Sequence, residues 1–196
     1  MTTAAVIKHQ KEFSKTTLGF WIYLMTDCVL FASLFATFAV LRGGTAGGPS
    51  GAELFDLDFV FIETMLLLAS SLTSGLVLVG IRAGSKKIIA SMLVATFLLG
   101  AGFLGMELYE FAELARDGHS WQASAFLSAY FTLVGTHGLH IAIGLLWIGV
   151  LLYSLWSRGI SNAFTKRASL FSMFWHFLDI IWIFIFTFVY LMGAIL

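Results

Sequence analysis

The chain has few of the residues that metal clusters and nucleic-acid surfaces need. Among 196 residues there is a single cysteine, Cys28, so an internal disulfide and a thiolate metal cluster are both excluded. Charged residues make up only 11%, with 11 basic and 11 acidic side chains and a formal net charge of zero. Nothing in that balance indicates a nucleic-acid partner. Because Cys28 has no mate, cysteine usage does not reveal the redox compartment.

What the chain does have is apolar sequence. It is 59% hydrophobic, with a mean hydropathy of +0.93, which is too apolar for an ordinary soluble domain. Five runs are near or above the roughly 20 residues that a bilayer requires: residues 18–41, 58–81, 88–115, 126–156 and 170–196. The first is longer than the apolar core of a secretory signal, so it is predicted to remain as a helix. We therefore predict an all-α integral membrane bundle of five transmembrane helices, forming one membrane domain over 18–196.

The positive charges predict the orientation of these helices. Residues 1–17 form a polar, mildly basic tail, and alternate loops continue the basic side, which carries Lys8, Lys11, Lys15, Arg82, Lys86, Lys87, Arg158, Lys166 and Arg167. Only Arg42 and Arg116 fall on the opposite side. The positive-inside rule then places the amino-terminal tail in the cytoplasm and, after five crossings, the carboxyl terminus in the periplasm.

Acidic and histidine side chains lie inside the predicted spans, whereas every lysine and arginine lies in a tail, in a loop or at a span edge. The acids and histidines within the spans are Asp27, Glu63, Glu107, Glu110, His137, His140, His176 and Asp179. Ionisable groups at membrane depth are costly and often functional. A bare carboxylate in hydrocarbon is too costly to persist, so we expect these acids to be neutral, hydrogen-bonded to histidine or solvated in a polar cavity.

Counting about 1.5 Å of rise per residue from the cytoplasmic helix ends predicts two polar layers. Glu63, Glu107 and His137 fall about 28 Å deep, with Glu110 and His140 within a turn of them. Asp27 and Asp179 fall about 13 Å deep, with His176 one turn nearer the cytoplasm.

Three interpretations of these layers remain open from the residues alone. The layers can be hydrogen-bond networks that hold helices together, proton relays, or a metal site built from Glu-x-x-Glu and His-x-x-His on adjacent helices. Three membrane histidines cannot ligate two haems and a copper, so the chain is not a redox core by itself. It also shows neither the internal repeat nor the broken helices typical of a transporter.

Ordered motifs give the chain a family resemblance. The segments Gly135–Gly144, Phe174–Asp179 with Trp182, and Glu107–Glu110 resemble subunit III of haem-copper respiratory oxidases. Leu66–Ser71 and Tyr190–Gly193 add to the resemblance in the same order. The first span, Gly19–Asp27, is most similar to the ubiquinol oxidase branch of the bo type. The cytochrome c oxidase branch usually has glutamate where Asp27 stands.

The resemblance implies an accessory subunit of a bacterial inner-membrane complex that oxidises ubiquinol, reduces oxygen and pumps protons. This subunit would contact subunit I directly, with subunits II and IV in the same complex, and would itself bind no metal or cofactor, the haems and copper lying in subunit I. It would support assembly, stability and sustained turnover. Its helices would form groups of two and three around a cleft filled with structural phospholipid. The alternatives are subunit III of a cytochrome c oxidase, or an autonomous metal-dependent membrane enzyme or proton-coupled carrier.

Overall fold

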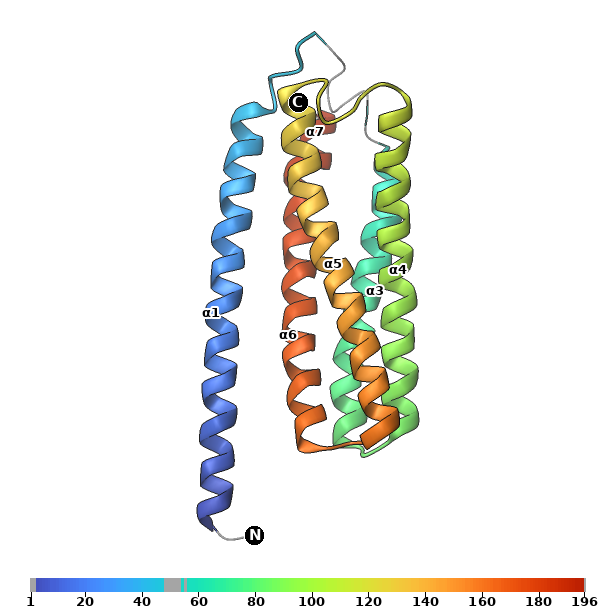
Figure 1. Ribbon diagram of the computed structural model, residues 1–196. Coiled ribbons are helices and arrows are strands. Elements are labelled where there is room, and N and C mark those ends of the chain that lie inside the picture. Colours follow the sequence, from blue (N-terminus) through green and yellow to red (C-terminus); the bar gives the residue numbers. More distant parts are fainter. Residues whose placement is uncertain (1–2, 48–53, 55, 196) are drawn as a thin grey trace.

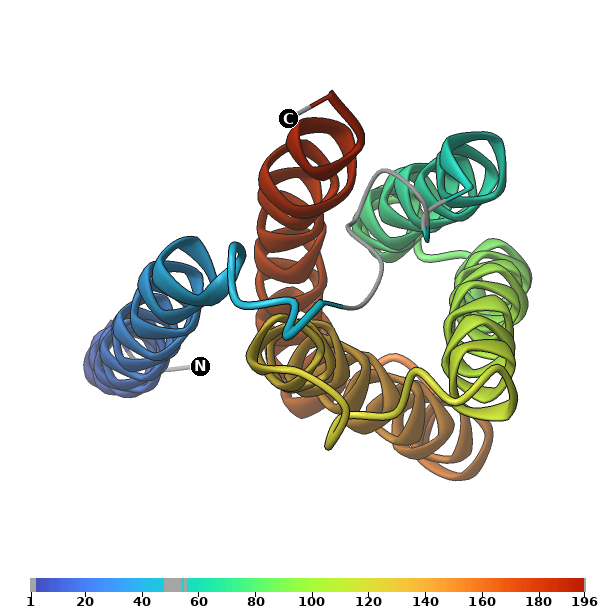
Figure 2. The ribbon, with the colours of Figure 1, turned by 90° about the horizontal axis from the view of Figure 1, so that it is seen from above.

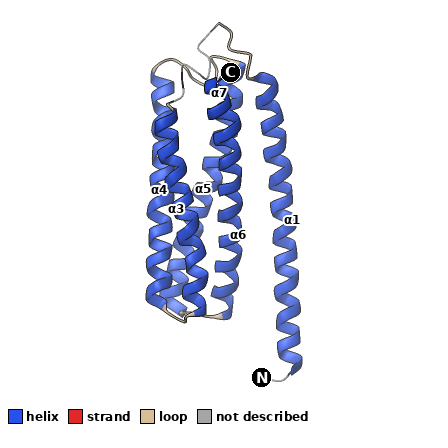
Figure 3. Ribbon diagram, turned by 180° about the vertical axis from the view of Figure 1, so that it is seen from behind, coloured by secondary structure: helices blue, strands red, loops and turns tan. Residues whose placement is uncertain are grey.

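The computed structural model describes residues 3–47, 54 and 56–195, and side chains from residue 15 to residue 193 within those ranges. The elements are α1 (Thr3–Leu41), α3 (Leu57–Arg82), α4 (Lys86–Arg116), α5 (Ala125–Arg158), α6 (Asn162–Ile185), the π-helical turn η1 (Phe186–Leu191) and α7 (Met192–Ile195) (Figure 1). In this part of the chain all regular structure is helical (Figure 3). Five of its helices are long and apolar enough to cross a membrane. The predicted all-α bundle of five transmembrane helices is confirmed.

Short polar side chains set the starts of four long helices. Asp56, Ser85, Ser124 and Ser161 each adopt an extended backbone conformation and accept a hydrogen bond from a backbone N–H of the first turn that follows. The N–H groups of a first turn have no carbonyl partner within the helix, so each capping side chain satisfies a backbone donor at the helix start. The caps fix where α3, α4, α5 and α6 begin.

The four helices α3, α4, α5 and α6 form a closed bundle, and α1 lies outside it. Each helix of the bundle packs against two others, in the order α3, α4, α5, α6 and back to α3. The view from above shows this ring, with α1 set apart against α5 and α6 (Figure 2). The predicted grouping of two helices and three is therefore wrong, because α3 belongs to the bundle and not with α1.

Connector length explains this grouping. Only residues 83–85 join α3 to α4, so the two helices must be antiparallel neighbours. Gly80 strengthens the pairing, since a Cβ there would lie 3.1 Å from side-chain atoms of Ile88 and Ile89. The connector between Leu41 and Leu57 is much longer and does not constrain α1 to lie beside α3.

The helix ends agree with the sequence prediction to within two residues for α3, α4 and α5. Two starts differ. α1 begins at Thr3, so the described part of the expected tail, residues 3–17, continues the first span as helix. α6 begins eight residues before the predicted Leu170, because Ser161 caps it and Phe164 and Ala168 are buried in its first turns. Met1 and Thr2 of the predicted tail, and Leu196 at the end of the predicted membrane domain, lie outside the described residues.

Two tryptophans of α6 tie the bundle together from the inside. Trp175 and Trp182 are fully buried, and their indole N–H groups donate to Ser70 Oγ at 2.9 Å and to Thr64 Oγ1 at 3.0 Å, both on α3. Each bond satisfies a buried donor that would otherwise be costly. The hydroxyl pair Thr73–Thr96, at 2.8 Å, links α3 to α4 in the same way.

Candidate functional site

Three ionisable side chains from three helices are buried inside the bundle. Glu63 of α3, Glu107 of α4 and His137 of α5 are each no more than 1% exposed. The carboxyl groups of Glu63 and Glu107 are close enough to interact electrostatically with each other and with that of Glu110. Within the described part of the chain, no hydrogen-bond partner lies within reach of the side-chain oxygens of Glu63 and Glu107 or the ring nitrogens of His137. The sequence placed these three residues at one depth, and the structure brings them into one interior.

A glycine of α5 makes room for the Glu107 carboxyl group. A Cβ built on Gly138 would lie 2.6 Å from Glu107 Oε1, so any larger residue would push the carboxyl group away. His137 precedes Gly138 in α5, and its imidazole is enclosed by rings, with centroid distances of 5.3 Å to Trp182 and 5.9 Å to Phe103. The motif Gly135–Gly144 therefore serves both to place a histidine and to admit an acid from α4.

Glu110 ends a hydrogen-bonded chain that sequence reasoning did not find. The hydroxyl of Tyr190 donates to Glu110 Oε2 at 2.8 Å, and the hydroxyls of Tyr190 and Tyr130 lie 2.9 Å apart. Both tyrosines are fully buried. Tyr190 lies in the π-helical turn η1, a local departure from α-helix that is often found at functional sites and that apolar periodicity does not reveal. The only available signal was Tyr190 within the last motif.

Asp27 does not lie where the depth count placed it. Its carboxyl Oδ2 is 3.8 Å from His140 Nε2, whereas the count assigned the two residues to different layers. The ring nitrogen Nδ1 of His140 donates to the Thr136 carbonyl at 2.7 Å, which directs Nε2 toward Asp27. The prediction is wrong because α1 begins well before Leu18 and α5 crosses the bundle at an angle, so residue counts do not convert directly into height (Figure 1).

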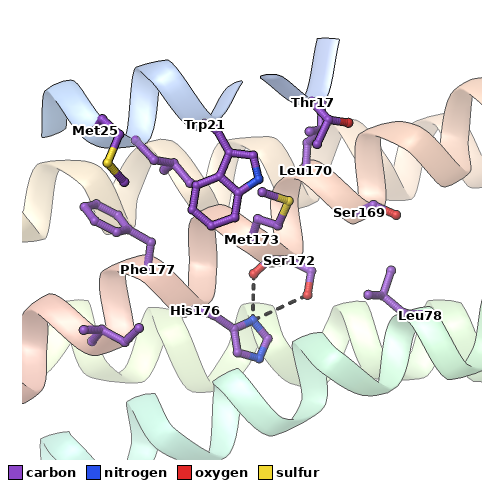
Figure 4. Close-up of a pocket in the computed structure, with 12 residues that line it drawn as sticks. Thr17, Trp21, Met25, Leu78, Ser169, Leu170, Ser172, Met173, His176 and Phe177 are labelled. Carbon is purple, nitrogen blue, oxygen red and sulfur yellow. Dashed lines mark hydrogen bonds between the residues drawn. The ribbon is translucent and has the colours of Figure 1, made fainter. Parts of the chain in front are cut away.

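The remaining pair, His176 and Asp179, stays together as expected, on α6. Asp179 is buried near Ser71 and His176. His176 itself is exposed, not buried as the prediction required, because its ring borders an open groove. Its Nδ1 donates to the Ser172 carbonyl at 2.7 Å (Figure 4).

That groove runs between α1 and α6 and has two parts. The first has a volume of about 600 Å³ and is walled by apolar side chains of α1 and α6 and by Leu78 of α3 (Figure 4). Its polar members are Thr17, Ser169, Ser172 and His176. The second, of about 500 Å³, lies further along α1 and α6 and continues into η1. It is bordered by Phe35, Phe38, Phe184, Phe188 and Arg42. We call the two parts together the lateral groove. It is not the predicted cleft, which would have separated α1 and α3 from the other three helices, because α3 packs against α4 and α6.

The chemistry available to these groups is hydrogen bonding and proton transfer. Among residues 3–47, 54 and 56–195, no three His, Cys, Asp or Glu side chains are grouped so as to hold a metal ion. Glu107 and Glu110 share α4, whereas His137 and His140 share α5, so the two residue types are segregated. The side chains thus fit an interior polar network between helices.

Known proteins match the chain over nearly its whole length. Residues 3–194 match the sequence model of the family described as cytochrome c oxidase subunit III. The chain is 55% identical to cytochrome bo(3) ubiquinol oxidase subunit 3 of Pseudomonas aeruginosa, over 92% of this chain and 86% of that one. It is 53% identical to the protein of the same name in Pseudomonas putida, over 92% and 87%. Cytochrome c oxidase subunit 3 of Bacillus sp. strain PS3 is 50% identical, over 91% and 86%. The chain therefore belongs to the cytochrome c oxidase subunit III family.

Proposed function

We propose that this chain is the accessory subunit III of a bo-type ubiquinol oxidase in the bacterial inner membrane. The observation that carries the proposal is the 53–55% identity to two proteins named as that subunit, over 92% of the chain. The aspartate at position 27, in a first span similar to the quinol branch, supports the same choice. In this proposal the amino terminus is cytoplasmic and the carboxyl terminus periplasmic.

An accessory role fits the chemistry of the chain. Its polar interior joins helices, and we propose that the haems and copper of the complex lie in subunit I, which this chain contacts directly, with subunits II and IV completing the assembly. Buried polar side chains that meet across helices hold membrane bundles together. We therefore assign Asp27 with His140 to the attachment of α1. Glu63, Glu107 and His137 are assigned to the stability of the bundle through water-mediated hydrogen bonds, because their polar atoms have no partner among the described residues.

The lateral groove suits a phospholipid. Its walls are apolar, which matches acyl chains, and its first part ends in hydroxyl side chains at Thr17 and Ser169. Lys166 lies at the same end, where its Nζ donates to Thr16 Oγ1 at 2.6 Å. A cation and hydroxyl groups beside an apolar channel match a phosphate headgroup followed by hydrocarbon. Phospholipid bound here would fill the space between α1 and the bundle.

A second candidate function is the same role in a cytochrome c oxidase. Among relatives from Bacillus subtilis, cytochrome c oxidase subunit 3 is 49% identical and quinol oxidase subunit 3 is 46% identical. Sequence identity to this chain therefore does not by itself separate quinol oxidase subunits from cytochrome c oxidase subunits within the family. This candidate shares the accessory role and differs only in the donor that the complex accepts.

Purification of the tagged chain from its own membranes in mild detergent tests the proposal. We expect a haem-bearing subunit to copurify, giving a visible haem spectrum, and the complex to consume oxygen with ubiquinol. Oxygen uptake with reduced cytochrome c and none with ubiquinol would select the second candidate. A chain that purifies alone, without haem, and is itself an active metal-loaded enzyme or proton-coupled carrier would refute both.

A further inference from the structure

A stripe of acids on α4 leads from the centre of the bundle to its end. Glu107, Glu110 and Asp117 follow one face of α4 and its C-cap at helical spacing. Exposure rises along the stripe, since Glu107 is 1% exposed, Glu110 is half-buried and Asp117 is exposed. The distance covered by these ten residues of helix is about 15 Å. A single helix thus connects the buried acids with the surface.

At the surface the stripe opens into a polar pocket, which we call the acidic vestibule. It has a volume of about 500 Å³ and is lined by Leu54, Asp56, Phe59, Glu110, Glu113, Leu114, Asp117 and His119. It lies at the end of the bundle where α4 finishes and α3 begins, the upper end in Figure 1. Glu110 belongs both to this vestibule and to the hydrogen-bonded chain with Tyr190 and Tyr130. It is the junction between surface and interior.

The interior beyond Glu110 holds buried polar side chains that call for a hydrogen-bond partner. Glu63, Glu107 and His137 are almost fully buried, and their polar atoms find no hydrogen-bond partner in the described part of the chain. Buried polar atoms in native proteins are nearly always hydrogen-bonded, either to protein or to ordered water. Water is the ligand that suits such a place, because one molecule can both donate to a carboxyl group and accept from an imidazole.

We propose that the centre of the four-helix bundle is a hydrated, protonatable site, and that it exchanges protons with bulk water through the acidic vestibule. In the exchange Glu107, which holds a proton, passes it outward through internal water to a carboxylate oxygen of Glu110. The O–H bond formed on Glu110 then breaks as its proton passes to a vestibule water, which becomes hydronium, and uptake follows the same steps in reverse. Each step moves a proton between oxygens, and no electron moves. Tyr190 is a positioning residue that holds Glu110 at the junction.

The ionisable groups around this route are almost all acids or phenols. The interior is faced by Glu63 from α3, Glu107 and Glu110 from α4, His137 and Tyr130 from α5, and Tyr190 from η1. The vestibule adds Asp56, Glu113, Asp117 and His119. No lysine or arginine lines the vestibule or is among the groups that act on the buried acids within the described residues. Several carboxyl groups without a fixed cation cannot all be ionised, so the cluster must hold protons.

Hydrogen–deuterium exchange followed by infrared spectroscopy of the intact complex tests the proposal. We expect a carboxylic-acid C=O band that disappears in Glu107→Gln and that shifts when the buffer is changed to D₂O. In Glu110→Gln the shift should slow by about a hundredfold, the lower end of what a positioned acid–base group contributes to proton transfer. Tyr190→Phe keeps the ring volume and Glu110, and should slow the shift as well. If the complex with Glu110→Gln does not assemble, the exchange rate of the Tyr190→Phe complex tests the route instead.

The matched control is Asp179→Asn, which removes a buried carboxyl group outside the route and should leave the Glu107 band exchanging at the wild-type rate. Three results would overturn the proposal: no band that depends on Glu107, a band that does not exchange, or equal exchange rates in wild type, Glu110→Gln and Tyr190→Phe. The haem spectrum of the same samples reports assembly separately. A failed exchange experiment on a haem-bearing complex would therefore leave the proposed function standing.

Discussion

Gly144 of α5 is where the packing of the bundle is tightest. A Cβ at this position would lie 2.5 Å from Cζ3 and 2.9 Å from Cε3 of Trp175. The ring has no free direction in which to move, because Trp175 is fully buried and a Cβ on Gly100 would lie 2.8 Å from its other edge. Gly144→Ala must therefore displace the indole and stretch its hydrogen bond to Ser70.

The expected size of the effect follows from three contributions. Overpacking a close-packed interior costs about 1–3 kcal/mol, and loss of the indole hydrogen bond costs about 0.5–1.5 kcal/mol. Alanine offsets about 1 kcal/mol of this through its higher helix propensity. Gly144→Ala should thus destabilise the bundle by about 2 kcal/mol.

The assay is the fraction of monodisperse complex that survives heating in mild detergent. The matched control is Gly149→Ala on the same helix, where a Cβ would meet nothing within 4 Å and only the gain in helix propensity remains. We expect the chain with Gly144→Ala to dissociate from the complex at a lower temperature than the wild-type chain. The chain with Gly149→Ala should dissociate at the wild-type temperature or above it. Equal stability of the two variants would refute the close packing of α5 against Trp175.

Three further substitutions test other parts of the molecule. His137→Ala should reduce the yield of assembled complex while leaving the haem spectrum of the assembled fraction unchanged, since the histidine belongs to the helix interior; an assembled complex without haem signals would contradict this. Asp27→Asn should leave the initial rate of oxygen uptake near wild type and shorten the time over which it is sustained, because it weakens the contact of α1 with His140; an assembled enzyme that is inactive from the first turnovers would argue against that. Trp182→Phe removes the donor to Thr64 and should lower stability by about 1 kcal/mol in the same heating assay, with an unchanged melting profile as the opposing result.

Much of the fold follows from local features of the sequence. Apolar runs and their lengths predict five spans, and the bounds of α3, α4 and α5 lie within two residues of the predicted ones. The start of α6 lies eight residues before the apolar run, because Ser161 caps the helix and its early turns carry the charged residues Lys166 and Arg167.

Helix neighbours and side-chain heights depend on information that a single sequence does not carry. The position of α1 beside α5 and α6 reflects packing and a long connector, not chain order. Counting residues from the cytoplasmic helix ends assigns Asp27 and His140 to different depths, although Asp27 Oδ2 lies 3.8 Å from His140 Nε2. The link from Tyr190 to Glu110 depends on a π-helical turn that has no periodic signature. In contrast, Glu63 and Glu107 lie on adjacent, nearly antiparallel helices, and for them the count sufficed.

The central claim is that this chain supports an oxidase without performing its chemistry. The most direct measurement is ubiquinol-dependent oxygen uptake, followed from the first turnovers to exhaustion, by the complex with this chain and by the complex from which it has been removed. We predict equal initial rates and a faster loss of activity without the chain. A complex that lacks the chain, retains its haems and yet consumes no oxygen from the outset would contradict the claim.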